Sequence, residues 1–145
     1  MKKTIFLFTA AFFLFFTPAC KKDKEIIQSN TELLTTGSWK ITASVSDNDG
    51  NGSYETNEFA LFSACFIDNI FTFKTNGQLE LDEGPTKCDV MDPQIETVNW
   101  QFTTNDTKIL VGSDTYDITE LSTTTFKIKE NFSGGGSSVV TFTKR

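Results

Sequence analysis

Histidine is absent from this chain of 145 residues, and cysteine is scarce, with three residues and no Cys-x-x-Cys pair. Without histidine, a Ser-His-Asp or Cys-His catalytic arrangement is impossible, and a zinc site would need an unusual ligand set. Carboxylates that could serve glycoside chemistry cluster at Asp68, Asp82 and Glu83. These residues fall at predicted strand ends or outward positions, where solvation accounts for them. The sequence therefore predicts a protein that is not an enzyme.

Basic charge and long apolar runs are also lacking. The N-terminal apolar stretch, residues 5–16, is shorter than the ~20 residues that a membrane-spanning helix needs. Removal of a leader would take two of the 13 basic residues and none of the 19 acidic ones, leaving 11 against 19 and a formal charge of −8. An acidic chain disfavours nucleic acid and membrane binding through a polybasic patch. We expect no nucleic-acid partner.

The N-terminus has the pattern of an export signal, with two lysines, the apolar stretch and small residues that lead to Cys20. This pattern resembles the relaxed lipobox of Bacteroidetes-type lipoproteins, although Thr17 stands where leucine is common. The resemblance implies cleavage of residues 1–19, acylation of Cys20 and a lipid-anchored protein of the bacterial outer membrane, facing the periplasm or the cell surface. The alternative is ordinary signal cleavage, which also exports the chain.

Two further features follow from this leader. Residues 20–30 begin with a lysine and acidic cluster without core-forming residues, which indicates a lipidated tether ahead of a single domain at 31–145. If Cys20 carries lipid, Cys65 and Cys88 remain as an even pair in an oxidising compartment, where a disulfide is the default.

From Trp39 onward, apolar and polar residues alternate, with Trp39, Ile41, Ala43 and Val45 on one face. The same period of two recurs seven times, at Phe71/Phe73, Leu79/Leu81, Val98/Trp100/Phe102, Ile109/Val111, Tyr116/Ile118, Phe126/Ile128 and Val140/Phe142. Period-two segments separated by turn residues predict an all-β fold. We expect an eight-stranded antiparallel up-and-down barrel whose last strand closes onto the first. A two-sheet sandwich is the alternative.

Hairpin registers can be tested, because residues opposite each other in an antiparallel pair share a face. The predicted pairs are Phe102 with Ile109 across Asn105-Asp106, Val111 with Tyr116 across Ser113-Asp114, Phe73 with Leu79 across residues 75–77, and Phe126 with Phe142 across residues 133–137. The third register requires Gly77 to be left-handed. It also brings Cys65 and Cys88 close to facing each other, which supports their disulfide.

Several motifs together resemble the lipocalin-like domain of Bacteroidetes lipoproteins. They are Gly37-Ser38-Trp39, the Asp/Asn/Gly loop at 47–52, Cys65-x-x-Asp68-Asn69, Phe71-x-Phe73, Asn76-Gly77, Gly84-Pro85-Thr86-Lys87-Cys88-Asp89 and Trp100. The resemblance implies a small barrel that starts at Trp39, preceded by a short helical turn for which Ser29 to Glu32 supply a capping box. In some lipocalins a cation stacks on this tryptophan, but we expect Lys144 and Arg145 to fray at the terminus.

The resemblance also implies that the interior holds a small apolar molecule. The candidate cavity residues are Trp39, Phe71, Phe73, Trp100, Phe102, Tyr116, Phe126 and Phe142. An eight-stranded barrel is just wide enough to be filled by its own side chains or to hold one small ligand. A filled barrel with a structural or protein-interaction role is therefore the alternative to a binding module.

One loop matches the calcium pattern D-x-[DN]-x-[DN]-G-x5-E at every specified position. The predicted ligands are the side chains of Asp47, Asp49 and Asn51, the Ser53 carbonyl, Glu55 through water, and bidentate Glu58. No basic residue lies between Ile41 and Phe73, so these carboxylates lack a counter-ion in sequence. We expect a structural Ca²⁺ site, followed by a helix within residues 56–66. A solvated turn is the alternative.

Overall fold

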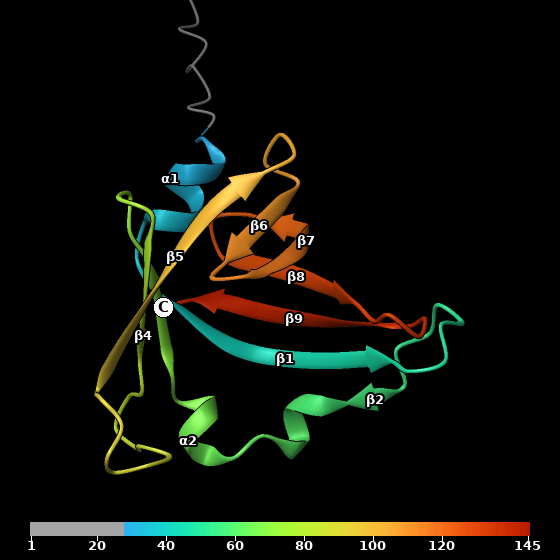
Figure 1. Cartoon of the computed structure of the whole chain (residues 1–145), viewed down its shortest axis with the longest axis horizontal. Helices are drawn as coiled ribbons and strands as arrows, with labels where there is room; N and C mark the ends of the chain where they lie inside the picture. The colour runs from blue at the N-terminus through green and yellow to red at the C-terminus, as the bar shows by residue number, and fades with distance from the viewer. Residues whose placement is uncertain (1–27) are drawn as a thin grey trace, which may run out of the picture.

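The computed structural model describes residues 28–145 (Figure 1). The predicted leader, the lipidation site Cys20 and tether residues 20–27 lie outside the described residues. Over 28–145, every helix is too short to cross a membrane.

The described chain begins with helix α1 (Asn30–Thr35), which confirms the predicted helical turn. Ser29 and Glu32 form the predicted capping box, because the Ser29 side chain accepts from the Glu32 N–H while the Glu32 carboxylate accepts from the Ser29 N–H. The carbonyl of Leu34 accepts a hydrogen bond of 2.8 Å from the buried indole N–H of Trp39. This bond ties α1 to the start of the first strand.

Nine strands form one antiparallel sheet that closes into a ring (Figure 1). They are β1 (Trp39–Asp47), β2 (Thr56–Asn57), β3 (Ile70–Phe73), β4 (Gln78–Asp82), β5 (Ile95–Thr103), β6 (Lys108–Val111), β7 (Asp114–Leu121), β8 (Thr125–Asn131) and β9 (Ser137–Lys144). Each strand from β3 to β9 pairs with its neighbour in sequence. Strand β1 closes the ring, because it pairs with β9 along its length and with β3 at Trp39 and Phe71. The all-β prediction is confirmed.

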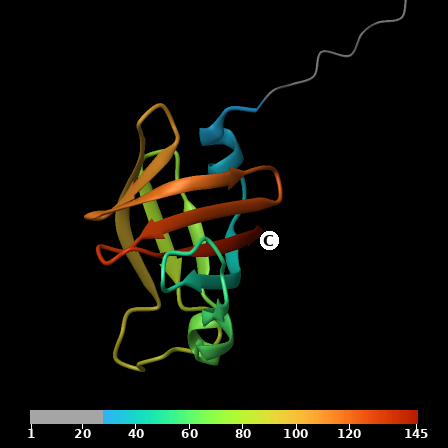
Figure 2. The ribbon, with the colours of Figure 1, turned by 90° about the vertical axis from the view of Figure 1, so that its right-hand side faces the viewer.

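The strand count differs from the predicted eight because of β2. This strand is two residues long and pairs with the far end of β1, at Val45 and Ser46. It belongs to the connection that also contains the 3₁₀ helix η1 (Glu58–Leu61) and helix α2 (Ala64–Ile67). The single helix predicted within 56–66 is therefore replaced by a short strand and two helical turns, the second of which ends at Ile67. Helices α1 and α2 lie at opposite ends of the ring (Figure 2).

Three of the four predicted hairpin registers are confirmed: Phe102 pairs with Ile109, Phe73 with Leu79, and Phe126 with Phe142. Gly77 is left-handed, as the second of these requires.

The register predicted between β6 and β7 is wrong by two residues. Ile109 faces Tyr116, and Val111 faces Asp114, so the two-residue turn is Gly112-Ser113 rather than Ser113-Asp114. Gly112 has φ of 61°, the conformation that a tight hairpin turn requires at its first central position and that glycine adopts without strain. A shift of two residues leaves the inward faces unchanged, because side chains alternate with period two.

The face predicted for β1 is correct only over its first half. The pairing with β9 slips between Ile41 and Ala43, which marks a β-bulge at the exposed Thr42. The extra residue reverses the alternation, so Ser44 and Ser46 are buried, while Ala43 and Val45 are only half-buried. The prediction that Ala43 and Val45 face the interior is therefore wrong.

Aromatic side chains fill the α1 end of the ring. The Trp39 ring contacts Phe126 edge-on, with centroids 5.9 Å apart, and Phe126 in turn meets Phe73 at 5.8 Å. Lys144 places its ammonium 4.7 Å from the centre of the Trp39 ring and donates to the Leu33 carbonyl at 2.9 Å. The expected fraying at Lys144 is therefore wrong, and this end of the ring is sealed.

The predicted disulfide is present at the opposite end. Cys65 in α2 and Cys88 in the loop between β4 and β5 are bonded, with their Cα atoms 5.1 Å apart. The bond fastens the η1–α2 connection to that loop.

We expect the Cys65→Ser/Cys88→Ser double variant to be less stable by about 3 kcal/mol, the loop-closure entropy of a bond that spans 23 positions. Urea unfolding monitored by circular dichroism measures this loss. Wild-type protein unfolded in reductant is the control and should match the variant. Equal stability of the oxidised wild type and the double variant would contradict a stabilising role for the bond.

Candidate ligand cavity and acidic loop

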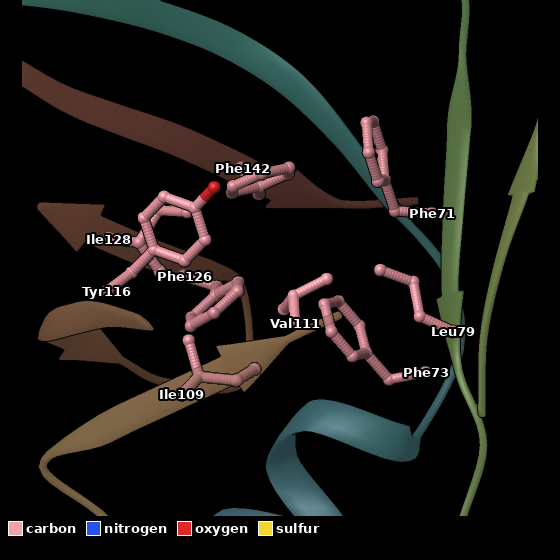
Figure 3. Close-up of a pocket in the computed structure, with 9 residues that line it drawn as sticks. All are labelled: Phe71, Phe73, Leu79, Ile109, Val111, Tyr116, Phe126, Ile128 and Phe142. Carbon is pink, nitrogen blue, oxygen red and sulfur yellow. The ribbon is translucent and has the colours of Figure 1, made fainter. Parts of the chain in front are cut away.

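The interior of the ring contains an apolar cavity of about 160 Å³ that opens to solvent (Figure 3). It lies next to the aromatic layer at the α1 end, on the side of that layer away from α1 (Figure 3). Six strands supply its lining: β3, β4, β6, β7, β8 and β9. The lining residues are Phe71, Phe73, Leu79, Ile109, Val111, Tyr116, Phe126, Ile128 and Phe142. Eight of these nine side chains are hydrocarbon throughout.

Five of the eight predicted cavity residues line this space: Phe71, Phe73, Tyr116, Phe126 and Phe142. The other three, Trp39, Trp100 and Phe102, do not line it. Trp100 is buried against Phe73 and Phe102, and its indole N–H lies 3.2 Å from the carbonyls of both Lys74 and Gln78. These rings belong to the packed part of the interior.

Four aliphatic lining residues were absent from the prediction: Leu79, Ile109, Val111 and Ile128. All four stand on the same alternating faces as the aromatic residues, so the period-two pattern contains the signal that identifies them. The restriction to aromatic residues caused the omission.

Tyr116 supplies the only polar side-chain atom among the nine lining residues. Its hydroxyl points toward Phe142 at the side of the cavity (Figure 3). Tyr116 is half-buried, and its hydroxyl forms no hydrogen bond within residues 28–145. Asp68 alone has a fully buried, unpartnered polar side-chain atom in this range, so the Tyr116 hydroxyl is accessible to solvent. Burial raises the pKa of Tyr116, and the negative charges of Asp114 and Glu130 raise it further, so the group is a neutral hydrogen-bond donor and acceptor at neutral pH.

The acidic loop follows β1 directly and packs on the turn between β8 and β9 (Figures 1 and 2). Gly136 in that turn comes so near that a Cβ atom there would lie 2.3 Å from the Asp47 carbonyl oxygen. The Tyr54 hydroxyl lies 3.0 Å from the Ser137 hydroxyl. The loop is therefore anchored to the end of the ring opposite α1.

Three of the six predicted calcium ligands come together. Carboxylate oxygens of Asp47, Asp49 and Glu55 all lie within 4.8 Å of one another. Among residues 28–145, none of these carboxylates forms a salt bridge. The cluster is therefore a concentration of negative charge without a salt-bridge partner in the described part of the chain.

The other predicted ligands are arranged differently. Glu58 belongs to η1 and accepts a hydrogen bond of 2.7 Å from Ser46 on β1. The Asn51 amide nitrogen donates to Asp49 at 3.0 Å, while its oxygen accepts from the Ser53 N–H. The cluster of three carboxylates does not include Glu58, so the full predicted set is not assembled around one point.

The side-chain carboxylate of Asp47 organises the loop by accepting hydrogen bonds from backbone N–H groups of the loop. One of its carboxylate oxygens accepts from the N–H groups of Gly50 and Asn51, and the other accepts from Gly52. Burial alone would raise the pKa of Asp47, but the hydrogen bonds from Gly52 and Gly50, with a smaller one from Asn51, bring it below the ordinary value of 3.8. The folded loop therefore prefers the ionised carboxylate.

A group whose pKa is lowered by folding stabilises the fold above its unfolded pKa and loses that contribution as the pH falls through the folded value. We expect Asp47→Asn to lower the melting temperature at pH 7 and to flatten its decline between about pH 5 and pH 3. Thermal unfolding across this range measures both effects. Asp106→Asn, in the turn between β5 and β6, is the control for loss of one negative charge.

Some acid sensitivity should remain in the Asp47 variant. Gln94 donates to Asp82, and Lys108 donates to Asp117, and these contacts lower the pKa of each carboxyl. A pH profile of the Asp47→Asn variant parallel to that of wild type would show that the hydrogen bonds from the loop do not stabilise the ionised form.

In comparisons with known proteins, no family model and no curated protein matches the chain. The function is therefore argued from the cavity and the loop.

Proposed function

We propose that this chain is an exported lipoprotein of the bacterial cell envelope, anchored through Cys20, whose ring of strands is a lipocalin-like barrel that binds one small apolar molecule. The single observation that carries the binding function is the apolar cavity of about 160 Å³ inside the ring. The lipobox-like pattern at residues 17–20 supports the anchor.

The size of the cavity supports a ligand of one ring. A dry protein cavity of about 150 Å³ lined by leucine, isoleucine and phenylalanine accommodates benzene, because transfer of an apolar molecule from water into such a space is favourable. The cavity of this protein has nearly the same volume and the same kinds of lining residue. Its opening to solvent allows a ligand to enter without unfolding of the ring.

The second candidate is a structural or protein-interaction lipoprotein whose barrel holds no ligand. The dense aromatic packing at the α1 end favours it, since Trp39, Phe73 and Phe126 form consecutive edge-on contacts there. The cavity is also smaller than the ~300–1,000 Å³ of ordinary ligand pockets. Direct binding measurements separate the two candidates.

We expect benzene to bind the domain of residues 28–145 and to shift the backbone amide resonances of cavity-lining residues in ¹H–¹⁵N NMR spectra. Binding to the folded state alone should also raise the melting temperature by mass action. Val111→Phe adds a ring to the cavity and should abolish the shifts. Leu110→Phe adds the same ring at the neighbouring position of β6, whose side chain has the opposite orientation, and should leave binding intact.

A folded wild-type domain that shows no response to saturating benzene would favour the ligand-free candidate. Binding that survives in a folded Val111→Phe variant would place the ligand outside this cavity.

We further propose that the Asp47–Glu58 loop takes a structural calcium ion. The support is the complete match to the calcium pattern together with the three carboxylates within 4.8 Å of one another. Like charges at this separation repel one another, and a hard divalent cation with oxygen ligands relieves the repulsion. Asp47, Asp49 and Glu55 would hold the ion, and recruitment of Glu58 would require it to leave Ser46.

We expect millimolar Ca²⁺ to raise the melting temperature of the domain, because the ion binds the folded loop. The control is the same concentration of Ca²⁺ with an excess of chelator. The dissociation constant should lie in the range of ~10⁻⁴–10⁻³ M typical of weak extracellular sites. The double variant Asp49→Asn/Glu55→Gln should lose this response, while Asp106→Asn should keep it. Calcium that shifts wild type and the double variant equally acts elsewhere on the protein.

A further inference from the structure

We propose that the cavity selects an uncharged aromatic molecule of one ring that carries a single hydroxyl group, a ligand of the phenol class, which it holds by a hydrogen bond to Tyr116, and that it rejects aromatic carboxylates. This inference rests on the proposed binding function and names the class of ligand.

The first support is the distribution of polar atoms. The cavity is lined by eight hydrocarbon side chains and by one hydroxyl, that of Tyr116 (Figure 3). Polar groups of a ligand that lie inside the cavity, away from its opening to solvent, would be unpaired except next to Tyr116, at a cost of about 1–3 kcal/mol for each. A ligand with one hydroxyl can pair it with the Tyr116 oxygen, which has no partner among residues 28–145.

The second support is the shape of the lining. Phe71 meets Phe142 edge-on with centroids 5.2 Å apart, and Phe142 stacks on Phe126 at 5.4 Å. These rings present faces and edges to the cavity, which suit a further aromatic ring in an offset or edge-on arrangement. The volume of about 160 Å³ admits one ring and excludes long acyl chains.

The third support is the charge around Tyr116. Asp114 lies two positions before it on β7, so their side chains share a face of the strand, and Glu130 lies on the paired strand β8. Within residues 28–145, no lysine or arginine lines the cavity. Three lysines lie at outward positions of the neighbouring strands: Lys108 pairs with Asp117, Lys127 pairs with Glu120, and Lys129 stands opposite Asp117 in the β7–β8 ladder. A ligand carboxylate placed next to the Tyr116 hydroxyl would lie near the negative charges of Asp114 and Glu130, which are both exposed, and the cavity lining within residues 28–145 offers it no counter-ion.

The test compares benzene, phenol and benzoate as probes of the folded domain by NMR titration at pH 7. In wild type, phenol should bind, and benzoate should bind at least about 10-fold more weakly, because its charge would be buried without a partner. Tyr116→Phe keeps the ring and removes the hydroxyl. It should weaken phenol about 5-fold, the contribution of one ordinary hydrogen bond, and change benzene by less than about 2-fold.

The chain contains two tyrosines, which provides a matched control. Tyr54→Phe removes the other phenolic hydroxyl, which lies against Ser137 outside the cavity lining, and should leave phenol affinity unchanged. The double variant Asp114→Asn/Glu130→Gln should reduce the discrimination against benzoate.

The outcomes separate this inference from the function on which it rests. Benzene binding with equal phenol affinity in wild type and Tyr116→Phe would overturn the inference and leave the binding function standing. Benzoate that binds as tightly as phenol would overturn it as well. Failure of all three probes to bind would overturn both.

Discussion

The pairing of β1 with β9 is the interaction on which the rest of the structure depends. These strands come from opposite ends of the described sequence, and their pairing runs from Trp39 opposite Lys144 to Asp47 opposite Ser137. Without it, both strands would present unpaired backbone groups at sheet edges, and the apolar faces of the other strands would have no enclosed interior. The cavity and the sealed α1 end both require this closure.

The pairing of β1 with β9 also determines which polar residues of β1 are buried. The bulge at Thr42 lies within the β1–β9 ladder, and beyond it the buried positions of β1 are Ser44 and Ser46 rather than apolar residues. Ser46 then holds Glu58, which fixes the start of the η1–α2 connection. One inserted residue therefore buries two serines on β1 at the end of the strand that leads into the acidic loop.

The sequence predicts most of the fold because its signals are local and repeated. Period-two alternation locates eight of the nine strands, and turn residues such as Gly77 determine the register of their hairpins. The bulge could not be found in this way, since Ala43 and Val45 are as apolar as an inward face requires. Ser44 and Ser46 are buried instead because the register of β1 with β9 shifts by one residue at Thr42, and this shift depends on the pairing of strands that are far apart in the sequence. Strand β2 has two residues, too few for a period to be recognised.

The candidate site is less predictable than the fold. Inward-facing residues could be identified, but whether they fill the ring or leave a space depends on how their volumes meet across it, which alternation does not encode. Trp100 and Phe102 pack against each other, whereas Val111 and Ile128 adjoin empty space. In the acidic loop, the sequence pattern identifies Asp47, Asp49 and Glu55, whose carboxylates come together, but it does not reveal the bond from Ser46 to Glu58, which joins residues 12 positions apart and depends on the bulge.

The position of the two tryptophans has a spectroscopic consequence. Trp39 and Trp100 are both buried in the packed part of the interior, and neither lines the cavity. The indole N–H of Trp39 donates to the backbone carbonyl of Leu34. The indole N–H of Trp100 lies within hydrogen-bonding distance of the backbone carbonyls of Lys74 and Gln78. Intrinsic tryptophan emission from this domain therefore originates from the layer that holds the ring together, and it is an optical signal of the integrity of the fold.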